Sequence, residues 1–99
     1  MKHKFHPDAA KEYGDATRWY ADRDLQLAFR FIEAVEETIS RVVDAPTRWR
    51  VIEEDVRRCL TRVFPYAVHY TIESDFILVV AVSHCSREPG YWRDRITKP

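Results

Sequence analysis

The spacing of hydrophobic residues changes along the chain, and each spacing predicts a different element. Residues 66–72 alternate between larger apolar or aromatic side chains and smaller or polar ones, a pattern typical of a half-buried strand. Residues 76–82 are apolar at every position, which predicts a central strand covered on both faces. The polar break at residues 73–75 fits a tight turn, so we expect the two strands to form an antiparallel hairpin.

Two longer stretches have the helical period. The first begins at Pro7, whose fixed φ suits a first helical position, and Asp8 and Glu12 complement the positive end of the helix dipole. Asp24 is a suitable N-cap for the second helix, which Pro46 ends. Consecutive helices with so short a break predict an antiparallel helical hairpin. The apolar stripes are Ala9, Tyr13, Ala16 and Tyr20 in the first helix, and Leu25, Ala28, Phe29, Ile32, Val35, Ile39 and Val42 in the second.

The rest of the chain completes an α+β pattern. Residues 2–6 form a candidate N-terminal strand, residues 47–55 look irregular, and residues 56–63 form an arginine-bearing strand near a sheet edge. The expected order is β-α-α-β-β-β, in which a helical hairpin packs on one face of a mostly antiparallel sheet. We expect one domain that spans residues 1–99.

Composition and charge narrow the class of protein. The chain has 16 basic and 16 acidic residues and a formal net charge of zero, which argues against a nonspecific polyelectrolyte binder. Cys59 and Cys85 form no CxxC pair, which suggests a reducing compartment. The chain has no apolar run of membrane-spanning length, and its N-terminus lacks the apolar core of a signal peptide. We therefore expect a cytoplasmic protein with no membrane partner.

Metal and nucleophile patterns are weak. The chain contains no HExxH, CxxC or HxxxH motif, so we expect neither a metal nor a cofactor. His84, Cys85 and Ser86 have the chemistry of a nucleophile and a base, but sequence neighbours rarely align in these roles. The consecutive acids of residues 53–55 point in different directions and make a poor acid–base pair.

A group of cations and aromatic residues is the strongest candidate site. It could bind phosphate and stack on bases, or it could engage an acidic, apolar segment of a partner. In the alternative interpretation, Tyr91 and Trp92 pack back on the helices and close the core; His84 and Arg87 are the better functional candidates. The group comprises Arg57, Arg58 and Arg62 on one predicted strand and Arg87, Tyr91, Trp92, Arg93 and Arg95 near the C-terminus.

In the order of its elements and in several short motifs, the chain resembles the RelE/ParE superfamily of type II toxin–antitoxin modules, often called plasmid stabilisation proteins. The resemblance covers nearly the whole chain. The motifs that carry it are Phe5-His6-Pro7-Asp8-Ala9, Trp19-Tyr20, the face from Phe29 to Val35-Glu36, Val56-Arg57-Arg58, Phe64-Pro65-Tyr66-Ala67-Val68-His69-Tyr70 and the segment from His84 to Trp92.

The resemblance implies a small cytoplasmic growth inhibitor that a cognate antitoxin, encoded beside it, holds inactive. In this family the C-terminal segment of the antitoxin wraps the toxin and covers its sheet and groove. RelE-like members cut messenger RNA on the ribosome with basic residues and a C-terminal Tyr or His. ParE-like members instead poison DNA gyrase and need no nuclease site.

The residues favour the ParE-like branch. Where the RelE pattern has two of its arginines, this chain has Ala67 and Cys85, which cannot stabilise charge on a phosphate. Tyr91 matches that pattern. As contacts to a target or antitoxin the resemblance suggests Arg57, Arg58, Arg62, His84, Arg87, Trp92 and Arg93, with no catalytic residue.

Three alternatives stay open at this point. A RelE-like ribosome-dependent endoribonuclease would use Arg62, His84, Arg87 and Tyr91. A folded but non-toxic relative is the second. The third is a homodimer, which could form through the apolar surface of the second helix.

Overall fold

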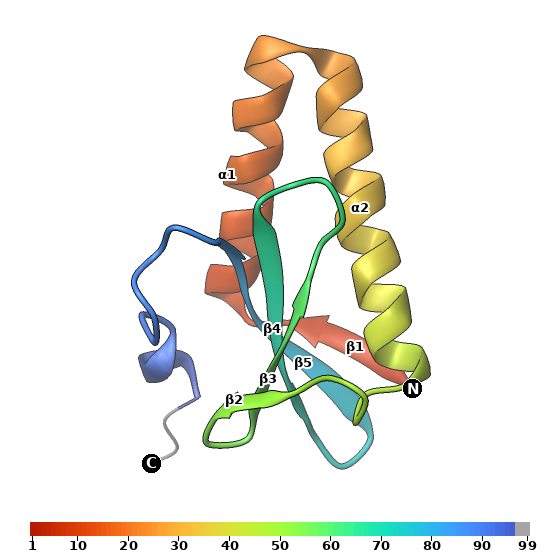
Figure 1. The fold of residues 1–99 in the computed structure, drawn as a ribbon, viewed down its shortest axis with the longest axis vertical. Helices are drawn as coiled ribbons and strands as arrows, with labels where there is room; N and C mark the ends of the chain where they lie inside the picture. The colour runs from red at the N-terminus through yellow and green to blue at the C-terminus, as the bar shows by residue number, and fades with distance from the viewer. Residues whose placement is uncertain (97–99) are drawn as a thin grey trace.

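A computed structural model describes residues 1–96 as a helical hairpin packed on a mixed sheet (Figure 1). The predicted α+β architecture is confirmed. The helices are α1 (Pro7–Arg23) and α2 (Leu25–Asp44); the strands are β1 (Lys2–Phe5), β2 (Val51–Glu53), β3 (Val56–Leu60), β4 (Tyr66–Ile72) and β5 (Phe76–His84); and a 3-10 turn, η1, spans Arg93–Arg95.

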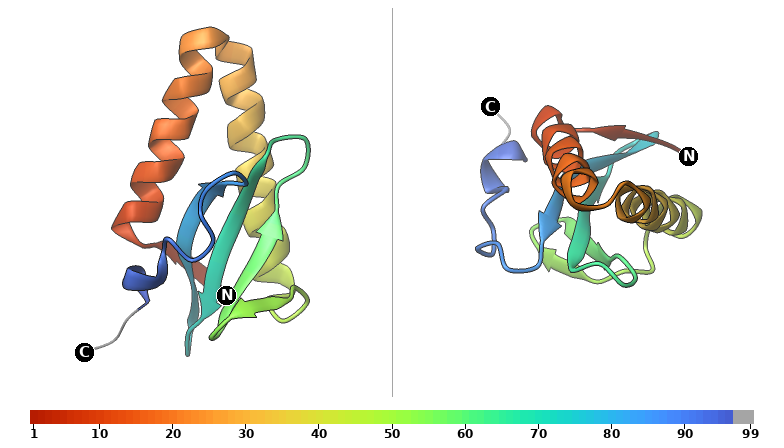
Figure 2. Two further views of the ribbon diagram at one scale, coloured as in Figure 1. Left: turned by 60° about the vertical axis from the view of Figure 1, so that its left-hand side comes forward. Right: turned by 90° about the horizontal axis from the view of Figure 1, so that it is seen from above.

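The sheet has the spatial order β1-β5-β4-β3-β2. Strand β1 runs parallel to β5, and the other neighbours are antiparallel. The apolar segment of residues 76–82 therefore lies inside the sheet, as its sequence predicts. Figure 2 shows α2 and the C-terminal tail (residues 85–96) on opposite sides of the strands.

Local capping explains where the helices begin and end. His6 caps α1, because its Nδ1 accepts a hydrogen bond of 3.0 Å from the backbone N–H of Asp8. Asp24 serves both helices: its backbone N–H closes α1, and its side chain accepts from the backbone N–H of Gln26 at 2.9 Å to begin α2. The N-cap predicted at Asp24 is confirmed.

The buried stripe of α2 differs from the predicted one. Leu25 and Phe29 are 59% and 50% exposed, whereas Phe31 is fully buried against the rings of Tyr20 and Tyr66. The outer end of the helical hairpin projects beyond the sheet (Figure 1), and in the second turn of α2 it is Phe31 and not Phe29 that turns towards Tyr66 of β4. Leu25 and Phe29, which the spacing placed on the apolar stripe of α2, therefore lie outside its buried face.

Strand β4 is buried on both faces rather than on one. A bulge in β5 brings Val80 and Ala81 to the face turned away from the helices, because one residue of β4 faces two residues of β5 there. Trp92 in the tail covers these residues and is only 2% exposed. The half-buried pattern of β4 did not predict this second cover, which comes from residues more than 20 positions away.

The structure also corrects two boundaries. Strand β2 lies in the segment expected to be irregular, and β3 ends at Leu60 instead of Val63. Val63 adopts a φ of 73°, and the N–H of Phe64 bonds to the carbonyl of Arg62 at 2.8 Å, so the chain turns sharply there. In residues 1–96 no helix is long and apolar enough to cross a membrane.

Candidate functional site

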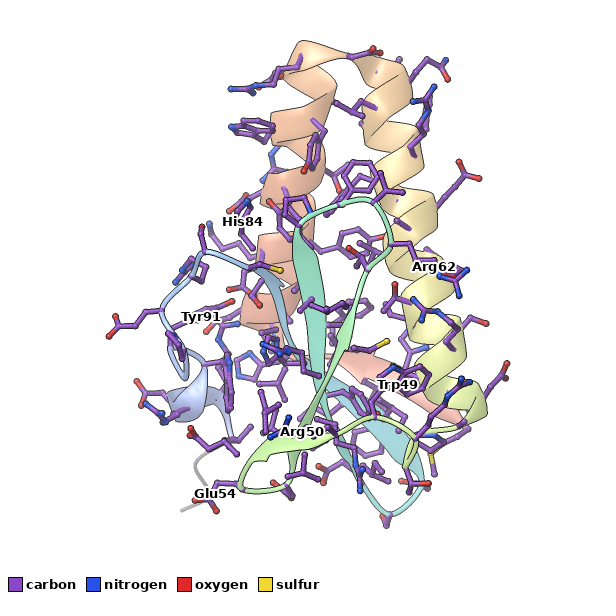
Figure 3. All side chains as sticks on the ribbon, in the orientation of Figure 1. Trp49, Arg50, Glu54, Arg62, His84 and Tyr91 are labelled. Atoms are coloured by element: carbon purple, nitrogen blue, oxygen red, sulfur yellow. The ribbon has the colours of Figure 1, made fainter. Side chains whose placement is uncertain are left out.

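A cleft of about 220 Å³ lies between the sheet and the C-terminal tail. Residues of strands β2, β3, β4 and β5 line it on one side, and the tail forms its wall. Figure 3 places His84 and Tyr91 on the tail side of the molecule, whereas Arg62 lies on the side of α2. Its polar and aromatic lining includes Glu53, Arg58, His69, Ser83, His84, Arg87, Glu88, Tyr91 and Trp92, and Ala67 and Cys85 line it as well.

The structure separates the three arginines that the sequence places on one strand. Neighbouring residues of a strand point to opposite faces, so Arg58 lines the cleft while Arg57 turns towards the helix side. There Arg57 donates to the carbonyl oxygens of Thr47 and Trp49 at 3.1 and 2.6 Å. Arg62 lies beyond β3 and forms an ion pair of 3.6 Å with Glu37.

The end of β5 and the tail bring further predicted residues to the cleft. His84, Arg87, Tyr91 and Trp92 all line it, together with Arg58. Trp92 is buried and belongs to the wall that the tail forms. Arg93 lies outside this set and donates to both carboxylate oxygens of Glu53, with one bond of 2.7 Å between Nη2 and Oε1.

Arg58 and Arg87 are the arginines that line the cleft, where Glu53 and Glu88 are the acidic lining residues. Within the described part of the chain, no acidic side chain forms an ion pair with either of them. The guanidinium carbon of Arg87 lies 3.9 Å from the centre of the Tyr91 ring, a cation–π contact. Two exposed guanidinium groups without a carboxylate partner can each accept a bidentate carboxylate or phosphate.

His69 adds a neutral group to the side of the cleft that the strands line. Burial, and secondarily the charge of Arg58, lower its pKa from the usual 6.5 to about 4. Its Nδ1 lies 3.2 Å from the hydroxyl of Ser83, and its ring packs 5.4 Å from that of Trp92. The imidazole is therefore uncharged near neutral pH, and the arginines carry the positive charge.

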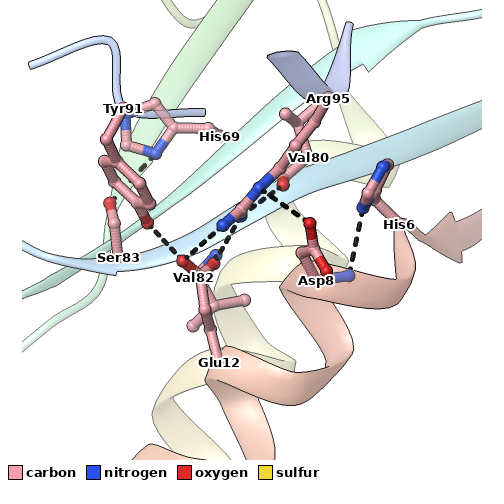
Figure 4. A network of polar contacts seen from close by, with 9 residues as sticks. All are labelled: His6, Asp8, Glu12, His69, Val80, Val82, Ser83, Tyr91 and Arg95. Carbon is pink, nitrogen blue, oxygen red and sulfur yellow. Dashed lines mark hydrogen bonds and ion pairs between the residues drawn. The ribbon is translucent and has the colours of Figure 1, made fainter. Parts of the chain in front are cut away.

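Tyr91 is held by a carboxylate that the sequence interpretation assigned to the helix dipole. Its hydroxyl donates to Oε2 of Glu12 at 2.6 Å (Figure 4). Burial, together with this hydrogen bond, raises the pKa of Tyr91 to about 12. The available signal was the position of Glu12 on the narrow inward stripe of α1, between Ala9 and Ala16.

Glu12 also pairs with Arg95 from the tail. Nη1 and Nη2 of Arg95 donate to the two oxygens of Glu12 at 2.8 and 3.0 Å, and the backbone N–H of Val82 donates to Oε1 at 3.1 Å. Arg95 further bonds to the carbonyl of Val80 and lies 3.7 Å from a carboxylate oxygen of Asp8. The tail is thus attached to both α1 and β5.

A second groove of about 390 Å³ runs between α1 and the ends of β4 and β5. Trp19, Tyr20 and Tyr66 give it aromatic walls, and Trp19 is 51% exposed. His84 and Arg87 line both the groove and the cleft, so the two form one continuous surface. This surface joins an aromatic section to one that Arg58 and Arg87 line.

The structure brings His84 and Ser86 into contact. The hydroxyl of Ser86 lies 2.7 Å from Nδ1 of His84, and the same nitrogen accepts the backbone N–H of Ser86 at 3.0 Å. Both contacts belong to one exposed turn, and in residues 1–96 no carboxylate is hydrogen-bonded to His84, so this pair lacks the third member that orients a catalytic base.

Cys59 is buried and Cys85 exposed, and both are free thiols. Residues 1–96 contain no group of three or more His, Cys, Asp or Glu side chains that could hold a metal ion.

Comparison with known proteins identifies relatives. The family model for the ParE toxin of the type II toxin–antitoxin system parDE matches residues 3–89. The solved structure of the chromosomal ParDE TA system from P. aeruginosa matches with a TM-score of 0.74 and 12% sequence identity, over 85% of this chain and 95% of that chain. At this identity the structural likeness concerns the fold. No curated protein matches the chain.

Proposed function

The chain belongs to the ParE toxin family of type II toxin–antitoxin systems, and we propose that it inhibits growth by binding DNA gyrase and that a cognate antitoxin neutralises it. The observation that carries this proposal is the pair of arginines in the cleft, Arg58 and Arg87, neither of which forms an ion pair within residues 1–96. Such groups suit recognition of carboxylates on a protein surface.

The cleft favours binding over RNA cleavage. Ala67 and Cys85, which replace two arginines of the RelE pattern, both line it and leave it short of the fixed cations that phosphoryl chemistry needs. Tyr91 has its hydroxyl engaged with Glu12 and a pKa of about 12, which makes it a poor proton donor or acceptor near neutral pH. Arg62 is paired with Glu37 away from the cleft.

The continuous surface fits an antitoxin segment of defined chemistry. An apolar or aromatic side chain of the antitoxin would occupy the groove beside Trp19 and Tyr66. An acidic side chain further along the same segment would reach Arg87 and Arg58. One segment would then cover the surface that the target also needs, which explains how an antitoxin could neutralise the toxin.

The proposal is tested by inducing the chain in bacterial cells and following labelled thymidine and methionine over the first minutes. We expect DNA synthesis to fall before translation, and we expect the purified chain to inhibit supercoiling by DNA gyrase. The double variant Arg58→Ala/Arg87→Ala should raise the inhibitory concentration at least about tenfold, because each lost charged contact contributes about 1.5–3 kcal/mol.

The matched control is Arg30→Ala/Arg50→Ala, which removes the same charge from exposed positions outside the cleft. This control should inhibit like the unmodified chain. An early fall in translation would instead favour the ribosome-dependent endoribonuclease. No change in either label would indicate a folded relative without toxicity in that host.

A further inference from the structure

We propose that Glu12 is the positioning residue of the cleft that Arg58 and Arg87 line, because it fixes Tyr91 and Tyr91 in turn orients Arg87. The expected effect on target binding rests on the proposed function. The contacts among Glu12, Tyr91 and Arg87 lie within the chain and do not depend on it.

The first step is that Glu12 itself has little freedom. Strand β1 pairs with β5 over residues 76–79, and the N–H of His6 then bonds to the carbonyl of Val79 at 2.9 Å. Beyond this point side chains replace the missing strand: Glu12 accepts the N–H of Val82, and Arg95 donates to the carbonyl of Val80, each at 3.1 Å. Pairing with buried backbone holds the Glu12 carboxylate in one place, and its side chain is only 16% exposed.

The second step leads from Glu12 to the cleft. The second carboxylate oxygen of Glu12 accepts the Tyr91 hydroxyl at 2.6 Å, which anchors the outer end of the ring. The guanidinium of Arg87 lies over that ring at 3.9 Å. No acidic side chain in the described residues pairs with Arg87, so the ring is the contact that orients its charged end.

The consequence for binding is entropic. A long side chain that is already ordered loses less rotamer freedom when a partner's carboxylate arrives. If the Glu12–Tyr91 bond is removed, Arg87 becomes mobile and must be ordered on binding. We expect about threefold to tenfold weaker binding, without loss of any group that touches the partner.

The molecule contains a matched control for this chain of contacts. The hydroxyl of Tyr13 donates to the carboxylate of Glu36 at 2.8 Å, and this pair joins α1 to α2 away from the cleft. Removing it with Tyr13→Phe or Glu36→Gln deletes the same type of bond but leaves Arg87 untouched. The test variants are Tyr91→Phe, which keeps the ring and removes only the hydroxyl, and Glu12→Gln.

The experiment measures Arg87 directly by NMR on the labelled full-length chain. The ring of Tyr91 should shift the Arg87 side-chain protons upfield. This shift should shrink in Tyr91→Phe and Glu12→Gln and persist in both control variants. The same four proteins are then compared as inhibitors of purified DNA gyrase, where the two test variants should need about threefold to tenfold higher concentrations.

Each outcome decides the inference. If the Arg87 protons keep their shift in both test variants, Glu12 does not position Arg87, and the inference is overturned whatever the gyrase assay shows. A lost shift with unchanged inhibition overturns its functional part. If the unmodified chain does not inhibit gyrase, the proposed function fails, while the NMR comparison still decides whether Glu12 orients the cleft.

Discussion

The two faces of the sheet are built from the same strands but differ in what covers them and in what they leave accessible. On the helix side, Tyr66 of β4 forms a continuous aromatic cluster with Tyr20 of α1 and Phe31 of α2. On the tail side, Trp92 from a short segment covers Val56, Val80 and Ala81, and the polar His69 is buried beside its ring. The comparison indicates that the helix side supplies most of the stability, whereas the tail side combines a minimal core with accessible cations.

The largest expected effects test whether both faces belong to one cooperative core. Phe31→Ala should lower the free energy of unfolding by about 3–5 kcal/mol, because it leaves a cavity at a fully buried ring. Trp92→Ala should lower the free energy of unfolding by a similar amount if the tail side unfolds together with the helix side. Urea denaturation followed by circular dichroism measures both. A cost below about 1 kcal/mol for Trp92→Ala would show that the tail opens independently of the helix side.

Lowering the pH should weaken the tail side selectively. Folding favours the neutral form of His69, whose pKa is lowered to about 4, so its stabilising contribution is complete above pH 6.5 and is lost as the pH falls towards 4. The loss should be roughly 3 kcal/mol at most. Denaturation curves between pH 7 and 4 measure it, and His69→Gln should flatten this dependence. An equal slope in that variant would assign the effect to other groups.

The smallest expected difference separates two neighbouring arginines of β3. Arg57→Ala should destabilise by about 1–2 kcal/mol, because the carbonyls of Thr47 and Trp49 lose a charged donor. Arg58→Ala should change stability by less than about 0.5 kcal/mol, since Arg58 is exposed on the cleft side. Thermal unfolding of the two variants side by side decides this. An equal loss of stability in the two variants would contradict the assignment of Arg57 to the fold and of Arg58 to the cleft.

Much of the fold could be predicted because its signals are local. Pro7 and Asp24 delimit the helices through backbone geometry and capping, which involve residues close in sequence. The continuous apolar run of β5 indicates a central strand for a similar reason, since both of its faces must avoid water. The same patterns, in order, also indicated the toxin family that the family model identifies.

The candidate site depended on contacts between distant segments. The sequence marked Arg57, Arg58 and Arg62 as one group, but the pleat of β3 and the turn after it send them to different surroundings.

Glu12 acquired its role only in the folded chain. A short β1 leaves the edge of β5 uncovered, and the tail returns there with Tyr91 and Arg95. The sequence by itself determined the elements and the chemistry available to them. Only the tertiary structure decided which of these groups meet, because the partners of Glu12 lie about 70 to 80 residues further along the chain.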